Sequence, residues 1–157
     1  MKELVKNYIL YVGNDYPHKN LARLKLAFEK IRQEGLDYEL VLITEWVSEE
    51  ELDKLYRNAS LYVFPSLYEG FGLPPLEAMA RGVPVVSSNA SCLPEILGDA
   101  VLYFNPLDVD DMAEKIKKAL VDRDLRERLI KNGFERIKKY SWRAMAQKTL
   151  EVYLISH

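Results

Sequence analysis

Residues 61–77 read LYVFPSLYEGFGLPPLE, and this stretch decides the fold. It opens with an uninterrupted apolar run, which is typical of a strand that is buried on both faces of a parallel sheet. A short loop with two glycines follows, and two adjacent prolines then mark the start of a helix, because proline is favoured in the first helical turn. The stretch therefore predicts a buried strand that passes through a tight loop directly into a helix.

The same alternation of strand and helix continues on both sides of this stretch. Strands are predicted over residues 8–13, 38–43, 61–65, 83–87 and 100–104. Helices are predicted from Leu21 to Gly35, after the capping residue Ser48, from Pro74 to Gly82, over residues 93–98, over residues 109–121 after the capping residue Asp108, from Asp124 to Tyr140, and after the capping residue Ser141. Such alternation indicates right-handed crossovers and a parallel sheet with helices on both faces. We therefore predict an α/β fold with a Rossmann-like parallel sheet of about five strands, in a single domain over residues 1–157 that includes C-terminal helices at about 124–156.

The composition is that of an ordinary globular domain. Hydrophobic residues make up 48% of the chain and charged residues 29%, and the formal net charge is −2. A nearly neutral chain is not a polycation, so no nucleic-acid partner is expected. The single cysteine, Cys92, excludes an internal disulfide, and we expect it to be a small buried residue. No apolar run approaches the ~18 residues of a membrane span, and residues 1–6 are too charged for a signal peptide, so a cytoplasmic protein is expected.

The loop after residue 65 has the features of an anion site. Gly70 and Gly72 let the backbone approach a ligand without a side chain in the way. The helix that starts near Pro74 presents its positive end, which suits a phosphate. Glu69 precedes the loop and Glu77 lies one turn into the helix, so both can face the crevice at the carboxyl ends of the strands. Two carboxylates beside a phosphate site indicate recognition of paired sugar hydroxyls.

Simpler explanations remain open for several of these residues. A glutamate in the first helical turn is favourable for dipole reasons alone, so Glu77 by itself would more often be structural. His18 is interpreted mainly as a loop residue. Ser87, Ser88 and Asn89 follow a predicted strand, and they either line the rim of the site or cap the next helix.

Residues 69–88 read EGFGLPPLEAMARGVPVVSS and resemble the Glu-x7-Glu signature of the retaining GT-B glycosyltransferases of family 4. Residues 11–21, YVGNDYPHKNL, resemble the first strand and loop of the C-terminal domain of these enzymes. Residues 46–52, 93–95 and 140–142 match further family motifs in the same order. The resemblance covers nearly the whole chain and implies the nucleotide-sugar-binding half of a GT-B fold.

The resemblance implies a hexosyltransferase that moves a sugar from a nucleotide-diphosphate donor to an acceptor with retention of configuration. Glu69 and Lys19 are the implied catalytic residues: Glu69 would hold hydroxyls of the donor sugar, and Lys19 would neutralise the departing pyrophosphate. A lysine at a helix start is badly placed unless an anion joins it. The implied donor-binding residues are Gly13, Asn14, Lys19, Glu69, Gly70, Phe71, Gly72, Leu73 and Glu77. Neither a metal nor a cofactor is expected, because the lysine, amides and helix dipole would stabilise the leaving group.

The chain departs from the family pattern in ways that bear on function. It matches one half of a two-domain fold, so we expect a separate acceptor-binding domain or subunit, any peripheral membrane association through that half only, and little turnover by the isolated chain. The position after Gly13, often an arginine in the family, is Asn14. Residues 40–43 run almost directly into residues 44–47, where the family inserts a strand and helix of about 30 residues.

These departures keep more than one function open. The leading hypothesis is the donor-binding domain, or donor-binding subunit, of a glycosyltransferase of polysaccharide or glycan biosynthesis. A non-catalytic GT-B-derived domain that binds a partner protein is favoured by Asn14 and by the short junction after Ile43. A related epimerase or phosphorylase fits the signature less well. The sequence names neither the sugar nor the nucleotide nor the acceptor, although mannose or glucose on GDP or UDP is typical of the family.

Overall fold

The computed structural model describes residues 7–155, apart from the side chains of Trp142, Ala144 and Ile155. Five parallel strands form one sheet in the order β2-β1-β3-β4-β5. They are β1 (Tyr8–Val12), β2 (Glu39–Ile43), β3 (Leu61–Phe64), β4 (Val85–Ser88) and β5 (Leu102–Phe104). β3 is buried along its whole length and β1 along all but its last residue, as their apolar runs predicted. The predicted α/β fold with a Rossmann-like parallel sheet is confirmed.

The strand order creates a switch point between β1 and β3. The chain leaves β1 outward to β2 and then returns to the other side of β1 to form β3, so that Leu10 lies opposite Val41 on one side and Tyr62 on the other. The loops that follow β1 and β3 therefore leave neighbouring strands in divergent directions. In open α/β sheets, a ligand crevice forms at such a point, outside the carboxyl ends of the strands.

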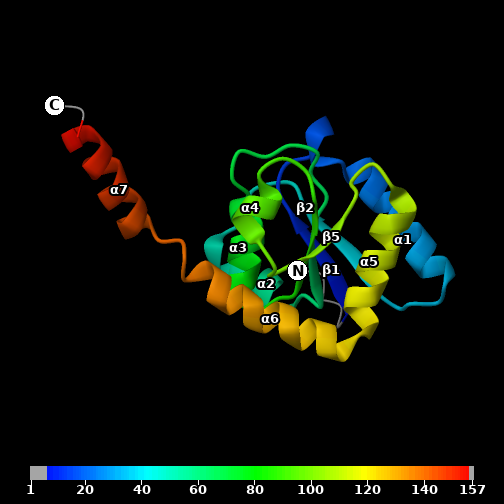
Figure 1. Ribbon diagram of the computed structural model, residues 1–157. Coiled ribbons are helices and arrows are strands. Elements are labelled where there is room, and N and C mark those ends of the chain that lie inside the picture. Colours follow the sequence, from blue (N-terminus) through cyan, green and yellow to red (C-terminus); the bar gives the residue numbers. More distant parts are fainter. Residues whose placement is uncertain (1–6, 156–157) are drawn as a thin grey trace.

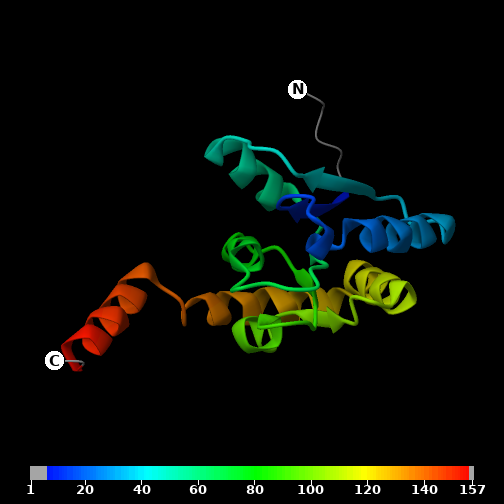
Figure 2. The ribbon, with the colours of Figure 1, turned by 90° about the horizontal axis from the view of Figure 1, so that it is seen from above.

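Helices cover both faces of the sheet. They are the 3-10 helix η1 (Pro17–Lys19) and the α-helices α1 (Leu21–Gln33), α2 (Glu49–Asn58), α3 (Leu73–Ala80), α4 (Leu93–Leu97), α5 (Val109–Val121), α6 (Arg123–Ile137) and α7 (Trp142–Ile155). Figures 1 and 2 show α1 and α5 on one face and α2, α3 and α4 on the other, while α6 crosses from α5 to α3 and α7 projects away from the body. No helix in the described part of the chain is long and apolar enough to cross a bilayer.

The helix starts test the capping predictions. Ser48 and Asp108 cap α2 and α5 through their side chains, as predicted. The predicted start of α6 at Asp124 is one residue too late, because the helix begins at Arg123 and Asp122 is its cap. Its backbone is extended, and its carboxylate accepts a hydrogen bond from the N–H of Leu125 at 2.9 Å.

Some other boundaries also differ from prediction. Val83 and Ala100 do not begin β4 and β5, because their N–H groups bond to carbonyl groups of α3 and α4 and thereby close those helices. Tyr140 lies beyond the end of α6, and its hydroxyl donates to the carbonyl of Ile96 at 2.8 Å. Both differences come from long-range or turn hydrogen bonds that the local apolar pattern does not register.

The edge strand β2 leads directly into α2. Residues 44–48 join the two elements, so the short junction predicted after Ile43 is present in the structure. Residues 40–43 of β2 are only half-buried, and Trp46 in the junction is 89% exposed. The β2 edge of the sheet is therefore more exposed to solvent than its central strands.

Candidate functional site

The loops after β1 and β3 are joined to each other at the switch point. The N–H of Leu67 donates to the carbonyl of His18 at 2.8 Å, which ties the β3–α3 loop to η1. One residue after His18 and two residues after Leu67, Lys19 Nζ donates to Glu69 Oε1 at 2.7 Å. The fold therefore brings the two residues that the sequence analysis named as catalytic into direct contact, although they lie 50 positions apart.

Asn20 fixes the position of Lys19, and the sequence analysis missed this role. Its backbone has φ 61° and ψ 29°, a left-handed conformation that asparagine tolerates better than most residues. Its side chain, only 4% exposed, donates to the carbonyl of Pro65 at 3.0 Å and to that of Pro106 at 2.8 Å. One buried amide thus connects the loops that follow β1, β3 and β5.

Lys19 and Glu69 form a nearly buried ion pair. Their side chains are 14% and 12% exposed, and Lys19 Nζ also lies 5.7 Å from the centre of the Phe64 ring. The alternative of a solvated lysine at a helix start is therefore wrong. Because desolvated charges need a partner, the loop is arranged to hold one cation and one anion side by side.

The amide groups of residues 70–73 are free to bind an acceptor. None of them donates a hydrogen bond to another residue within positions 7–155, and most of the segment is exposed. Gly72 has φ 89°, and a Cβ there would lie 2.8 Å from Leu93, so only glycine fits at this position. The next two residues are prolines without N–H groups. The free N–H groups therefore belong to the bend and to Leu73, the first residue of α3.

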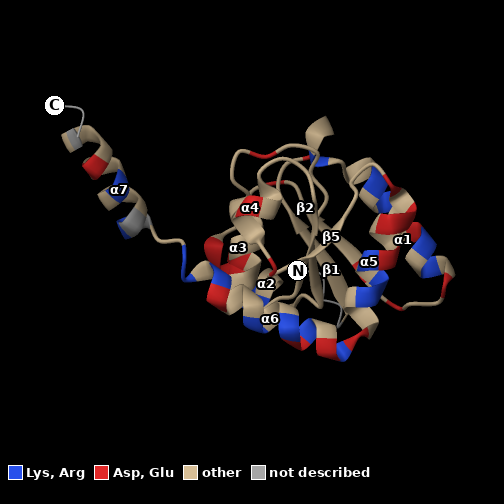
Figure 3. Ribbon diagram, in the orientation of Figure 1, with Lys and Arg blue, Asp and Glu red and all other residues tan. Residues whose placement is uncertain are grey.

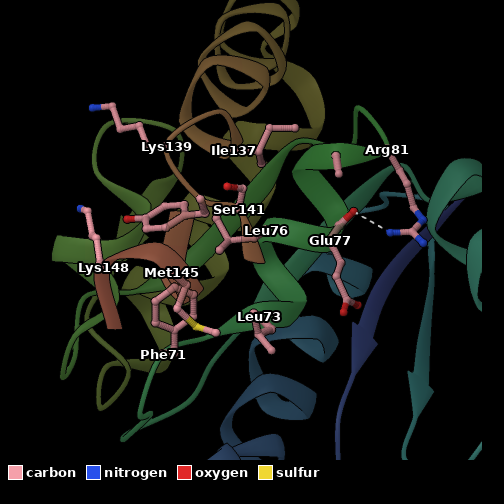
Figure 4. A pocket seen from close by; sticks show the side chains of 12 residues that line it. Phe71, Leu73, Leu76, Glu77, Arg81, Ile137, Lys139, Ser141, Met145 and Lys148 are labelled. Carbon is pink, nitrogen blue, oxygen red and sulfur yellow. Dashed lines mark hydrogen bonds between the residues drawn. The ribbon is translucent and has the colours of Figure 1, made fainter. Parts of the chain in front are cut away.

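Glu77 lies half-buried on α3, and its carboxylate forms no ion pair among the described residues. Tyr56 of α2 donates its hydroxyl to Glu77 Oε2 at 3.2 Å. Arg81 donates to the backbone carbonyl of Glu77 at 3.1 Å and not to its carboxylate, and Figure 4 shows this bond at the backbone oxygen while the carboxylate lies at the end of the Glu77 side chain. Burial, and then the charge of Glu77, raise the pKa of Tyr56 above its ordinary value, so the hydroxyl stays a donor.

Glu69 and Glu77 border the same edge of the sheet. Burial and then the charge of Glu69 raise the pKa of Tyr11, which lies in β1. Burial raises the pKa of Tyr62 in β3; Tyr56, Tyr11 and, least of all, Glu77 add to that effect, while a hydrogen bond to the carbonyl of Val12 opposes it. The charge of Glu69 thus acts on Tyr11 in β1 and that of Glu77 on Tyr62 in β3, two neighbouring strands of the sheet.

Gly13 and Asn14 complete the first loop. Gly13 has φ 148°, and a Cβ there would lie 2.7 Å from the hydroxyl of Tyr11, so the position requires glycine. That hydroxyl donates to the carbonyl of Asn14 at 2.7 Å, and the side chain of Asn14 accepts from the N–H of Tyr16 at 3.4 Å. The side chain of Asn14 is therefore engaged with its own loop, and the loop offers no second cation beside Lys19 among the described contacts.

The serines at the end of β4 brace the site and do not line it. Ser87 and Ser88 are fully buried, which contradicts the rim position, and neither caps α4. Ser88 Oγ donates to the carbonyl of Ser66 at 2.6 Å and accepts from the N–H of Ala90 at 3.1 Å. The β4–α4 loop is thereby fastened beneath the β3–α3 loop.

Cys92 differs from its expected role as a purely apolar core residue. It is half-buried, and its thiol donates to the carbonyl of Glu69 at 3.3 Å. Ser91, in a left-handed conformation with φ 56°, donates its hydroxyl to the same carbonyl at 2.8 Å. These contacts hold the backbone of Glu69 while its side chain faces Lys19.

A pocket of about 700 Å³ adjoins the bend on the side of α6 and α7. Most of its lining is apolar, and the Phe71 ring packs edge-on against Tyr140 with centroids 5.5 Å apart. Its lining residues, drawn in Figure 4, are Phe71, Leu73, Leu76, Glu77, Ala80, Arg81, Ile137, Lys139, Tyr140, Ser141, Met145 and Lys148. The pocket shares Phe71, Leu73 and Glu77 with the candidate site.

The surface charges are mixed in sign. Figure 3 shows basic and acidic residues interspersed along α1, α5 and α6, without a large area of one sign on these helices. Across the described residues, no group of three or more His, Cys, Asp or Glu side chains is arranged to hold a metal ion. The charged groups of the site are the single pair Lys19–Glu69 and the carboxylate of Glu77.

The fold and the site define a doubly wound α/β domain with a polar ligand edge at its switch point. Residues 39–136, more than half of the chain, match the family Glycosyl transferases group 1, and the chain belongs to this family.

Relatives of this chain are longer than the chain itself. It is 36% identical to O-antigen chain mannosyltransferase B of Escherichia coli, over 94% of this chain and 46% of that protein. It is 35% identical to the serotype-specific mannosyltransferase WbdA of Escherichia coli, over 95% of this chain and 18% of that protein. The structure of sucrose-phosphate synthase from Thermosynechococcus elongatus is similar with a TM-score of 0.76 and 28% identity, over 94% of this chain and 45% of that chain. The chain thus spans less than half the length of each.

The lengths of the matches bear on the short junction after β2. The match to mannosyltransferase B runs over 174 residues, more than the 157 of this whole chain, so that relative carries residues in the matched region that this chain lacks. The match to WbdA runs over 149 residues and covers 95% of this chain, without a net surplus of residues. A region as short as this one therefore also occurs in a protein named as a transferase.

Proposed function

We propose that this chain is the C-terminal, donor-binding domain of a retaining GT-B glycosyltransferase of family 4, a cytoplasmic enzyme of polysaccharide or glycan biosynthesis. It binds a nucleotide-diphosphate sugar, and an acceptor-binding domain or subunit completes the active site and allows turnover. The observation that carries this proposal is the run of free amides at residues 70–73, with Glu69 and Lys19 on one side and Glu77 on the other.

The proposed roles follow from what each group can bind. The amides of residues 70–73 and the ammonium of Lys19 hold the diphosphate, whose negative charge grows as the sugar departs. Glu77 accepts hydrogen bonds from the ribose hydroxyls, and Glu69 accepts them from hydroxyls of the donor sugar. Since the cation and the amides are already in place, the leaving group is stabilised without a metal or a cofactor in this proposal.

The relatives indicate which donors to test first. Mannosyltransferase B and WbdA are both named for mannose transfer, which favours mannose as the donor sugar here. The nucleotide is left to experiment, with GDP and UDP as the first pair. The acceptor is expected to bind to the half that this chain does not cover.

A second function, a non-catalytic binding domain, is supported by Asn14 and by the short β2–α2 junction. Asn14 takes the place of a family arginine, so one cation fewer faces the diphosphate. The match to WbdA weighs against this reading, because a region without net surplus occurs there in a protein named as a transferase. The two functions differ in whether the bend binds a nucleotide at all.

Isothermal titration of this chain with GDP, UDP and their mannose and glucose esters tests the proposal. We expect saturable binding of at least one nucleotide, and a loss of about 30- to 100-fold in affinity for Glu77→Ala, because a charged acceptor of two hydroxyls is removed. Glu114→Ala, which removes an exposed glutamate from α5 on the opposite face, is the control and should leave affinity unchanged. Absence of binding to every nucleotide would support the non-catalytic domain instead.

A further inference from the structure

The hydroxyl of the buried Tyr56 donates a hydrogen bond to the carboxylate of Glu77. The side chain is fully buried, and its hydroxyl lies 3.2 Å from Glu77 Oε2 and 3.5 Å from the carbonyl of Pro74. A hydroxyl has one proton to donate, and the carboxylate is both the nearer and the charged acceptor. The stronger hydrogen bond therefore goes to Glu77.

The ring of Tyr56 is held in place by its neighbours. The ring of Tyr62 lies 5.7 Å away, and the guanidinium of Arg81 lies 5.0 Å from the Tyr56 ring centre. Arg81 is itself bound to Asp53 of α2 at 2.8 Å. The hydroxyl is thus presented to Glu77 from a fixed direction, and the carboxylate cannot rotate freely.

We infer that Tyr56 is a positioning residue that aims the carboxylate of Glu77 at a vicinal diol of the nucleoside ribose. Tyr56 occupies Oε2 and leaves Oε1 for the ligand, so a ribonucleotide is preferred over a nucleotide that lacks the diol. The inference deepens the proposed function and rests on it. Tyr56 does not touch the ligand and acts only through Glu77.

Tyr8, which is fully buried, and Tyr103, which is half-buried, are examples of tyrosines whose hydroxyl groups have a purely structural role. Tyr8 donates to the carbonyl of Leu55 at 2.6 Å, and Tyr103 donates to that of Gly98 at 2.8 Å. Each hydroxyl donates to a backbone carbonyl, and neither is hydrogen-bonded to a carboxylate among the described residues. Tyr103→Phe is therefore a matched control for Tyr56→Phe, since each variant removes one hydroxyl from a packed ring.

The experiment measures the affinity of this chain for GDP and UDP and for their 2′,3′-dideoxy forms. We expect the unmodified chain to prefer the ribonucleotide about tenfold. Tyr56→Phe should reduce this preference to about twofold and leave the affinity for the dideoxy form unchanged. Tyr103→Phe should leave the preference as it is. In a Glu77→Gln background, Tyr56→Phe should have no further effect, because the group that it positions is already altered.

Other outcomes separate the inference from the proposed function. If Tyr56→Phe weakens both forms of the nucleotide equally, or still acts in the Glu77→Gln background, Tyr56 is only structural and the inference fails. If Glu77→Gln binds as the unmodified chain does, or if no nucleotide binds, the proposed function itself fails and the inference falls with it. Should Tyr56→Phe unfold, Asp53→Asn serves in its place: it releases Arg81 from α2, and an unchanged ribonucleotide preference would then overturn the inference.

Discussion

Glu69 and Glu77 lie at the two ends of one bend, and the protein holds them with different chemistry. Glu69 is paired with Lys19 at 2.7 Å, and both side chains are nearly buried. Glu77 accepts a hydrogen bond from the neutral hydroxyl of Tyr56 at 3.2 Å. One acid thus has a charged partner, and the other has a neutral hydrogen-bond donor.

The difference indicates different tasks for the two ends. In the proposed function, Lys19 waits for the diphosphate in a nearly buried position. The carboxylate of Glu69 offsets the cost of removing the ammonium group of Lys19 from water. In that function, a diphosphate then replaces one anion beside Lys19 with another. Glu77 there faces the neutral ribose hydroxyls, for which an unpaired carboxylate is the better acceptor, and a tyrosine can orient it without reducing its charge.

The largest effect is expected at the cation. Lys19→Met removes the positive charge and leaves Glu69 unpaired beside the phosphates, so we expect the affinity for a nucleoside diphosphate to fall about 100-fold. Titration calorimetry provides the measurement. Lys30→Met is the control, because Lys30 pairs with Asp110 at an exposed position on α1. Equal affinities for the two variants would show that the Glu69 end does not bind phosphate.

A smaller effect is expected on the loop that carries Lys19. Asn20→Ala removes two buried hydrogen bonds, each worth about 1 kcal/mol, so the free energy of unfolding should fall by about 2 kcal/mol or more. Asn20→Gly loses the same bonds but accepts the left-handed backbone without strain, and it should be about 1 kcal/mol more stable than Asn20→Ala. Urea denaturation measures both. No loss in either variant would mean that the amide does not join the loops.

Replacing each acid by glutamine is expected to change the affinity for a nucleoside diphosphate in opposite directions. Glu69→Gln frees Lys19 from its carboxylate, so the affinity for a nucleoside diphosphate should rise about threefold. Glu77→Gln should lower that affinity, because it weakens an acceptor. Parallel titrations of both variants give the comparison. Changes in the same direction would remove the distinction between the two ends.

The last prediction is that the preference for a ribonucleotide over its dideoxy form does not change with pH. Burial and the charge of Glu77 raise the pKa of Tyr56 above the ordinary value of 10.0, so the hydroxyl keeps its proton until the pH rises well past that value. The preference for a ribonucleotide over its dideoxy form should therefore stay constant between about pH 7 and 9.5. A preference that declines steadily over this range would indicate that Tyr56 ionises too early to act as the donor.

The sheet and its order of elements could be predicted from the sequence because local patterns determine them. The continuous apolar runs of β1 and β3 report burial on both faces, and Ser48 and Asp108 mark helix starts through their own side chains. Asp122 and Asp124 offer the same side chain two positions apart, so the choice between them depends on the backbone that each adopts.

The candidate site was predictable only in part. Glu69, Glu77 and the glycine-containing bend are contiguous and carry a family signature. Asn20 was missed because its partners include Pro106, which is 86 positions away. No pattern in α2 indicates that the hydroxyl of Tyr56 reaches a carboxylate on α3. Contacts between elements decide such roles, and periodicity within one element does not encode them.

An NMR titration of the ¹⁵N-labelled chain with GDP and with UDP tests the central claim most directly. We predict saturable shifts that are concentrated in the amides of residues 70–73 and in Lys19, with little change in α5 on the opposite face. Unchanged amides at residues 70–73 in the presence of saturating nucleotide, or shifts centred away from the switch point between β1 and β3, would contradict the account.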